Sequence, residues 1–332
     1  MQLMARYAKV TVLPQAQLRY PLWEEYPNKK ADPEALLQMM LPHLQKNLEE
    51  AMLDKPDLIV LPEVCDRFSM MPIDERHRYY RYRGDKILDF YREQAIKNHC
   101  YIAYSACRCV PEDTKYPFRN STQIIGRNGE VVGIYDKNHL VPAELDEGLM
   151  GYGTEAPVFE LDFGRVGCAI CFDLNYDELL MRYAAQKPEL MIFSSMYPGG
   201  VVQEKWAVTC RSYFAASVCN KDCRILNPMG QLLNHTPEFT YHATQRINLD
   251  YAMLHLDHNH AFAPSEGKLY AAKRKYGDKL VIHANDNLGY TMITYEDTDR
   301  TAMDIVREFD MILLDDYFNN CRAHRNAHIA QP

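Results

Sequence analysis

Short apolar runs alternate with amphipathic segments along this chain, and this alternation is the feature that most limits its possible folds. Residues 7–13 and 57–61 are apolar runs of strand length. Between them, after an Asp32-Pro33 cap, leucines and methionines recur at helical spacing. Further on, Arg127-Asn128-Gly129 is a tight turn between two strands, because Asn-Gly tolerates a positive φ. Helical crossovers mixed with antiparallel hairpins predict an α/β sandwich rather than a simple Rossmann sheet.

The same criteria place the remaining elements. We expect helices over residues 85–98, 176–186 and 203–219, and strands over 101–106, 121–125, 130–135, 158–161, 165–170, 190–194, 224–226, 230–233 and 243–249. Beyond about residue 255 the pattern is less regular, with strands expected over 279–282 and 291–295 and a helix over 302–309. We find no segment with the composition of a linker, so one catalytic domain is expected to take up most of the chain.

Three of the apolar runs end on side chains with acid, amine or thiol chemistry: Glu63, Lys137 and Cys171. Cys171 lies where an apolar run gives way to a helical pattern, and the positive end of a helix favours a thiolate. This set of groups suits acyl transfer at an amide or nitrile carbon. The sulfur would attack, Glu63 would move the proton, and Lys137 with the backbone N–H of Phe172 would stabilise the oxyanion.

The composition argues against several kinds of partner. The 332 residues carry a net charge of −8 and 47% of them are hydrophobic, which predicts no broad attraction to nucleic acid or to anionic membrane. There is no charged-then-apolar leader pattern and no apolar run of about 18 residues. Most of the ten cysteines lie within apolar runs, as is typical of reduced core thiols. We therefore expect a cytoplasmic protein that acts on a small molecule.

The three segments together resemble the nitrilase, or carbon–nitrogen hydrolase, superfamily. The resemblance rests on residues 61–63, 135–140 and 167–173, followed by a helix and the strand at 190–194, and it extends over roughly residues 5 to 250. It implies an αββα sandwich that pairs into a layered dimer or higher homo-oligomer. It also implies Glu63, Lys137 and Cys171 as the catalytic triad, with no metal and no organic cofactor. We take residues 1–260 as the catalytic domain and 261–332 as a C-terminal extension, packed on that domain or on a neighbouring subunit.

The resemblance implies further residues around the nucleophile. The family has a second glutamate between the lysine and the cysteine, which orients the substrate and the lysine. Glu147 is our first choice because it precedes the Gly151-Tyr152-Gly153 turn, and Glu144 is the alternative. The side chains expected to border the substrate are Phe172, Asn175, Tyr176 and Tyr197, with Phe172 and Tyr176 equally able to serve only in packing.

The residues after the nucleophile bear on the branch of the family. Phe172 and Asp173 stand where strict nitrilases have Trp and Glu. Carbamoyl-amino-acid hydrolases usually place an arginine a few residues after the cysteine to bind the substrate carboxylate, whereas here residues 174–176 are Leu-Asn-Tyr. An anionic substrate would therefore need a cation from elsewhere in the chain.

The segment Met196-Tyr197-Pro198, like the residues after Cys171, resembles the aliphatic amidases and formamidases. We therefore favour an amidase that forms a carboxylic acid and ammonia through a thioester. An N-carbamoyl amine or amino-acid hydrolase, an amide-forming acyltransferase and a non-catalytic binding module are the alternatives.

Four other features have simpler interpretations. His139 is interpreted as a structural hydrogen-bonding residue rather than a base for the cysteine. Cys107 and Cys109 are interpreted as buried thiols, and the His-rich segment 255–260 as a polar turn, rather than as metal ligands. The arginine- and tyrosine-rich segment 76–83 is interpreted as a solvated loop or helix face.

Overall fold

The computed structural model describes residues 6–21, 30–259 and 266–329, so His260 of the His-rich segment lies outside the described residues. The chain divides into two compact units. One contains residues 9–246, and the other combines the described part of residues 1–8 with that of residues 247–332. The division therefore falls earlier than the boundary we expected after residue 260, because the strand at residues 251–255 joins a sheet of the second unit.

The first sheet of the larger unit combines parallel and antiparallel strands. Its order is β12-β1-β2-β3-β4-β5, in which β1, β2 and β3 run parallel and β3, β4 and β5 antiparallel. The strands are β1 (Tyr7–Val12), β2 (Leu58–Val60), β3 (Tyr101–Cys109), β4 (Phe118–Ile125), β5 (Val131–Asp136) and β12 (Ala243–Asn248). The predicted hairpin turn joins β4 to β5, with Gly129 at a φ of 81°. Helices α1 (Pro33–Met52), α2 (Ile73–Arg83) and α3 (Lys86–Asn98) accompany this sheet, and the short helix α4 (Pro142–Asp146) follows β5.

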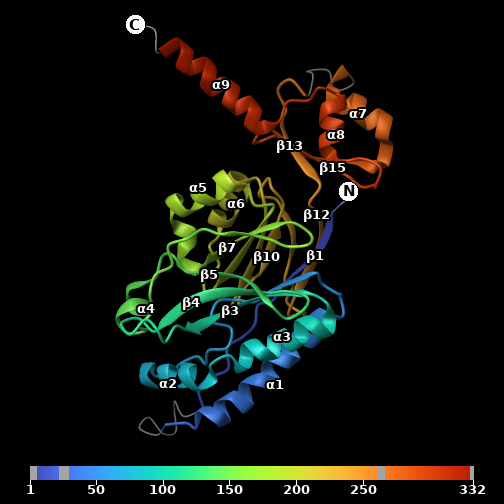
Figure 1. The fold of residues 1–332 in the computed structure, drawn as a ribbon. Coiled ribbons are helices and arrows are strands. Elements are labelled where there is room, and N and C mark those ends of the chain that lie inside the picture. The colour runs from blue at the N-terminus through green and yellow to red at the C-terminus, as the bar shows by residue number, and fades with distance from the viewer. Residues whose placement is uncertain (1–5, 22–29, 260–265, 330–332) are drawn as a thin grey trace. The chain divides into compact units, whose positions relative to one another are not determined.

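The second sheet of this unit has a similar construction, with the order β11-β10-β9-β8-β7-β6. Its strands β7, β8 and β9 run parallel, and the outer neighbours are antiparallel. The strands are β6 (Val158–Glu160), β7 (Arg165–Ile170), β8 (Leu190–Ser195), β9 (Tyr213–Val218), β10 (Arg224–Leu226) and β11 (Leu232–His235). Helices α5 (Asp177–Gln186) and α6 (Val201–Cys210) cover its outer face, while α1 to α3 cover that of the first sheet (Figure 1). The predicted αββα sandwich is confirmed; its pairing into a dimer stays a prediction.

One predicted element was wrong. The helix expected over residues 203–219 ends at Cys210, where Arg211 takes a left-handed conformation with a φ of 56°. The following residues form β9, and all six are buried. A strand in the middle of a sandwich is covered on both faces, so its continuous apolar sequence cannot be told from that of a buried helix by periodicity alone.

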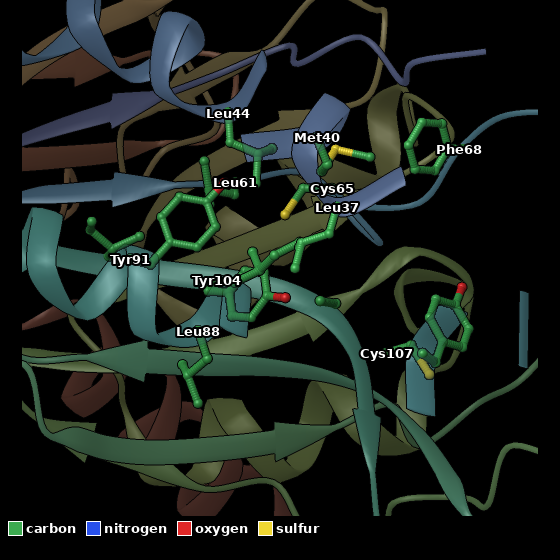
Figure 2. Close-up of a cluster of buried hydrophobic side chains, with 14 of the residues drawn as sticks. Leu37, Met40, Leu44, Leu61, Cys65, Phe68, Leu88, Tyr91, Tyr104 and Cys107 are labelled. Atoms are coloured by element: carbon green, nitrogen blue, oxygen red, sulfur yellow. The ribbon is translucent and has the colours of Figure 1, made fainter. Parts of the chain in front are cut away.

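Apolar side chains between the helices and the first sheet fix the end of β2. Leu37 and Met40 of α1 and Leu88 and Tyr91 of α3 belong to the same buried cluster as Leu61, which immediately follows β2 (Figure 2). Burying side chains of this kind contributes about 1.5–3 kcal/mol each. The cluster therefore holds in place the chain segment that leads into Glu63.

Two buried serine hydroxyls of the second sheet bond to the first sheet. Ser194 Oγ donates to the carbonyl of Leu61 at 2.7 Å, and Ser217 Oγ donates to the carbonyl of Leu13 at 2.6 Å. Both carbonyls lie just beyond the carboxyl ends of β1 and β2. The two sheets are therefore joined by direct hydrogen bonds at the edge where the reactive residues emerge.

The arginine- and tyrosine-rich segment is a helix that is only partly solvated, so that interpretation holds for Arg81 and Tyr82 but not for the rest of the segment. It forms α2, in which Tyr79, Tyr80 and Arg83 are buried. Arg83 forms a buried ion pair with Asp66 and donates a 3.2 Å hydrogen bond to the hydroxyl of Tyr104. A buried charge is tolerated when it is paired and hydrogen-bonded, which is why sequence polarity was misleading here.

The second unit has a separate core around an antiparallel sheet of order β13-β15-β14. Its elements are β13 (Tyr251–His255), α7 (Lys268–Tyr276), β14 (Leu280–Asn285), β15 (Tyr290–Tyr295), α8 (Ala302–Glu308) and α9 (Leu314–Ile329). Leu254, Leu269, Ile293 and Ile305 are among its buried residues. No helix in the described ranges combines the length and apolar character needed to cross a membrane.

Candidate active site

The structure brings Glu63, Lys137 and Cys171 into contact. They follow β2, β5 and β7 respectively, so the first sheet supplies the acid and the amine and the second sheet supplies the thiol. Lys137 Nζ lies 2.8 Å from Glu63 Oε1. The Cys171 thiol hydrogen-bonds to the same carboxylate. Three residues spread over more than 100 positions of the sequence therefore form one continuous series of polar contacts.

The glutamate beside the lysine is Glu144 rather than Glu147. Glu144 lies in the first turn of α4, where its Oε2 accepts from Lys137 Nζ at 2.8 Å and from the backbone N–H of Val141 at 2.9 Å. Glu147 is exposed at the C-terminal end of the same helix, and its own N–H donates to Ala143. Our first choice was therefore misplaced, because a side chain near the start of a helix can fold back over its free N–H groups while one at the end cannot.

Asn120 is a site residue that sequence reasoning missed. Its Nδ2 donates to Glu63 Oε1 and to Glu144 Oε1, both at 2.7 Å, and the residue is buried in β4. The signal lay in the hairpin register, in which Ser121 pairs with Asp136 and the carbonyl of Asn120 therefore accepts from the N–H of Lys137. One buried amide and one ammonium thus separate two carboxylates that would otherwise repel each other.

The backbone carries strain at both reactive strand ends. Cys171 has a φ of 50°, and Val64, directly after Glu63, has a φ of 44°. Non-glycine residues rarely adopt this left-handed conformation, and for a β-branched residue such as Val64 it is a marked outlier that costs about 1–3 kcal/mol. Such strain concentrates at functional sites, because the surrounding structure must over-determine it. Here it turns the chain sharply at Cys171 and directly after Glu63, the two residues whose side chains share a hydrogen bond.

The burial and charge of the site fix its protonation. Burial opposes the charge of Glu63, but Lys137 together with hydrogen bonds from Lys137, Cys171 and Asn120 lowers the pKa of this carboxyl below its usual value. Burial likewise opposes the charge of Lys137, yet the two glutamates beside it raise the pKa of the ammonium far above its usual value. Glu63 is therefore a carboxylate and Lys137 an ammonium at neutral pH.

The nucleophile itself rests as a thiol. Burial raises the pKa of Cys171 to about 12, and the charge of Glu63 adds to the rise while Lys137 opposes it. The helix start that was expected to favour the thiolate therefore does not lower this pKa below its usual value. The 3-10 helix that starts at Cys171 has only five residues, and its positive end does not offset burial beside a carboxylate. A thiol in this state needs a base to remove its proton before it can attack, and the Glu63 carboxylate is its hydrogen-bond partner.

Four side chains were expected to border the substrate, and the structure places them in contact with one another beside Cys171. They are Phe172, Asn175, Tyr176 and Tyr197. Asn175 Nδ2 donates to the carbonyl of Phe172 at 3.1 Å and to the hydroxyl of Tyr197 at 3.2 Å. The rings of Phe172 and Tyr176 are in edge contact at 5.5 Å. Burial raises the pKa of Tyr197 to about 12, and a negative charge on Cys171 raises it further, which indicates that this hydroxyl lies near the sulfur.

A buried carboxylate that sequence reasoning had not assigned holds this segment in place. Asp173 accepts from the hydroxyl of Tyr135 at 2.6 Å and from the backbone N–H groups of Ile170 and His139 at 3.0 and 2.8 Å. The His139 ring lies 3.0 Å from the same carboxylate and stacks on Tyr176 at 3.7 Å. The His139 side chain is thus engaged by Asp173, which agrees with its structural interpretation.

A glycine beyond α4 allows the lysine segment to be packed closely. Gly153 donates its N–H to the carbonyl of Lys137 at 2.8 Å, and a Cβ at this position would lie 2.0 Å from the carbonyl oxygen of Asp136. Any other residue would push the Lys137 segment away. Within the residues that the structure describes, no three His, Cys, Asp or Glu side chains are arranged to hold a metal ion.

The fold and the site geometry define a cysteine-containing αββα sandwich with a Glu–Lys–Cys constellation. The sequence profile of the carbon-nitrogen hydrolase family matches residues 16–220, which is more than half of the chain. The chain therefore belongs to the carbon–nitrogen hydrolase family.

Curated relatives agree with this assignment, and solved structures share the fold. A deaminated glutathione amidase from Dictyostelium discoideum is 22% identical over 236 residues, covering 61% of this chain and 80% of the relative. The human deaminated glutathione amidase is 23% identical over 173 residues, so the match spans about half of either chain, at 49% and 52%. The structure of Saccharomyces cerevisiae Nit3, from the nitrilase superfamily, superimposes with a TM-score of 0.61 at 17% identity, covering 74% of this chain and 91% of Nit3. A Nesterenkonia amidase does so with a TM-score of 0.60 at 16% identity, covering 75% and 93%.

Proposed function

We propose that this protein is a cysteine-dependent amidase, which hydrolyses a small linear amide to a carboxylic acid and ammonia through a thioester on Cys171. The observation that carries the proposal is the contact chain from the Cys171 thiol through Glu63 to Lys137 and Glu144. The relatives that are named amidases support the reaction class.

The first half of the proposed reaction forms the thioester. The Glu63 carboxylate takes the thiol proton as the sulfur of Cys171 bonds to the carbonyl carbon, and the carbonyl electron pair moves to oxygen. The Lys137 ammonium and the backbone N–H of Phe172 stabilise that oxyanion. When the carbonyl re-forms, the C–N bond breaks, and the protonated Glu63 gives its proton to the nitrogen, which leaves as ammonia.

The second half releases the acid. Glu63, again a carboxylate, takes a proton from water as the water oxygen bonds to the thioester carbon. The C–S bond then breaks, and Glu63 returns its proton to the sulfur. The raised pKa of Lys137 keeps it an ammonium throughout, so its role is electrostatic rather than acid–base. Glu144 and Asn120 position the lysine and the base.

A panel of small amides with an ammonia assay tests the proposal. Ammonia release by the native protein that disappears in Cys171→Ala is the expected result. Turnover only when an acceptor amine is added would indicate acyl transfer instead, and carbon dioxide released with the ammonia from carbamoyl compounds would indicate a carbamoyl hydrolase. Ammonia release that survives in Cys171→Ala would overturn the mechanism.

A further inference from the structure

The end of β8 brings a backbone N–H to the base of the candidate site. The N–H of Met196, the residue after β8, donates to Glu63 Oε2 at 3.1 Å. Ser194 of β8 pairs with Ile170 of β7 in the parallel register, and neighbouring strands lie about 4.8 Å apart. Cys171 and Met196 therefore lie just beyond the ends of two adjacent strands, and Glu63 of the first sheet contacts both.

The two carboxylate oxygens of Glu63 have different partners. Oε1 accepts from Lys137 Nζ at 2.8 Å and from Asn120 Nδ2 at 2.7 Å. A carboxylate oxygen offers about two lone-pair sites, so these two donors fill Oε1. Oε2 accepts the longer bond from Met196 and retains a site for the Cys171 thiol, which bonds to this carboxylate. Oε2 is therefore the oxygen that can take the thiol proton.

A buried serine fixes the turn that presents the Met196 N–H. Ser195 Oγ accepts from the backbone N–H of Tyr197 at 3.0 Å and donates to the carbonyl of the same residue at 2.7 Å. Serine hydroxyls stabilise turns by bonding to the backbone two residues further on, and this one is fully buried. The two bonds close the chain around Met196 and so direct its N–H toward Glu63.

We propose that the backbone N–H of Met196 is a catalytic donor and that Ser195 is the positioning residue that holds it. When the Cys171 sulfur gives its proton to Glu63 Oε2, negative charge leaves that oxygen and forms on the sulfur. An N–H beside both atoms can turn from the oxygen to the sulfur and stabilise the charge there. Burial dominates the pKa of Cys171, and a hydrogen bond from the Met196 N–H is among the effects that lower it. This inference rests on the proposed amidase function.

An ester in place of the peptide bond before Met196 removes this donor alone. Nonsense suppression with the α-hydroxy acid analogue of methionine replaces the N–H by oxygen and keeps the side chain. With the fastest substrate of the amide panel, we expect kcat to fall about 10- to 100-fold and KM to change less than about threefold, because the lost bond is to charge that forms during the reaction. The acidic limb of the kcat/KM profile should also move to higher pH, since the Glu63 carboxylate loses a donor that favours its charged form.

The same ester at Met229 is the matched control. The Met229 N–H donates to Asn227 Oδ1 at 2.9 Å in the turn after β10, so the substitution again removes one bond to a side-chain oxygen. Leu226, the last residue of β10, pairs with Phe214 near the start of β9, which places this turn at the opposite edge of the sheet from the site. The control ester should leave kcat and the acidic limb unchanged.

Ser195→Ala tests the positioning role. It should lower kcat about tenfold and move the acidic limb in the same direction as the Met196 ester does. When both changes are combined, Ser195→Ala should cost little further activity, because the serine acts through the N–H that the ester has already removed. Ser212→Ala is the control, since Ser212 is equally buried and its Oγ donates to the carbonyl of Tyr213 at 2.9 Å, ahead of β9.

A native kcat in the Met196 ester would overturn the catalytic donor while leaving the amidase intact. A Ser195→Ala loss that adds in full to that of the ester would overturn the positioning role. If the native protein hydrolyses no amide, the proposed function fails instead, and alkylation of Cys171 by iodoacetamide then decides the inference. Slower alkylation in the Met196 ester than in the Met229 ester supports the donor, and equal rates overturn it.

Discussion

Replacing Glu63 by glutamine tests the inference that the nucleophile rests as a thiol. With a Cys171 pKa of about 12, only about one molecule in 10⁵ carries a free thiolate at pH 7. The native protein avoids this penalty because Glu63 accepts the proton as the sulfur attacks. Glutamine has nearly the same shape and can still accept from Lys137 and Asn120, but it cannot take the proton. We expect kcat/KM for amide hydrolysis to fall about 10³- to 10⁴-fold at pH 7, in the range of general-base catalysis.

The pH dependence makes this prediction specific. The pKa of Glu63 lies below its usual value, so the native rate should be flat from about pH 6 to 9. Without the base, ionisation must come from solution, and the rate of Glu63→Gln should rise about tenfold per pH unit over the same range. Ammonia release measured across this range gives both profiles. Glu75→Gln removes another buried, ion-paired glutamate and is the control. A variant within tenfold of native, or one with a flat profile, would refute the reasoning.

Three further predictions concern neighbouring groups. Lys137→Arg should lower kcat in the ammonia assay by about 100-fold or more. The wide, planar guanidinium would replace a compact ammonium that lies 2.8 Å from each of two carboxylates. Near-native turnover would remove the lysine from the oxyanion role. Asn120→Asp puts a third carboxylate between the same two glutamates and should move the acidic limb of the kcat/KM profile up by about one pH unit or more; an unmoved limb would contradict the positioning role. In a Cys321→Ser background, which removes the exposed thiol, iodoacetamide should alkylate Cys171 faster than the fully buried Cys168, as followed by peptide mass spectrometry. Equal labelling would count against the nucleophile.

The three residues of the proposed triad could be picked out from the sequence because each follows a short apolar run. A polar residue directly after a buried strand lies at the edge of a sheet, where side chains from neighbouring strands can meet. Glu63, Lys137 and Cys171 all satisfy this rule, and the layered fold brings their strand ends together. Hairpin and crossover signals were likewise enough to predict an α/β sandwich, and the family resemblance implied its αββα arrangement.

The two groups that support the lysine were harder to predict. Choosing between Glu144 and Glu147 required knowing that α4 starts at Pro142, which places Glu144 in the first turn with its carboxylate folded back on Val141. A proline at the first helical position and a glutamate two residues later are the local signal that could have decided it. Asn120 could be recognised only from the pairing register of β4 with β5.

Long-range charge compensation cannot be read from local patterns at all. Arg83 looked like a surface residue because its partner, Asp66, lies 17 positions earlier in the chain and in another element. The same limit explains why the sequence overstated the influence of the helix start on the thiol. A helix start is visible in the sequence, whereas the burial of Cys171 and its bond to Glu63 come from the packing of one sheet on the other.

The serine hydroxyls that join the two sheets have a consequence for how activity is acquired. A chain that has formed only its first sheet holds the base and the ammonium without a nucleophile, and one that has formed only the second holds a thiol without a base. Ser194 and Ser217 make their bonds only when the sheets meet. During refolding, turnover should therefore return only when the two sheets dock. This return should come later than the circular dichroism change that reports strand formation.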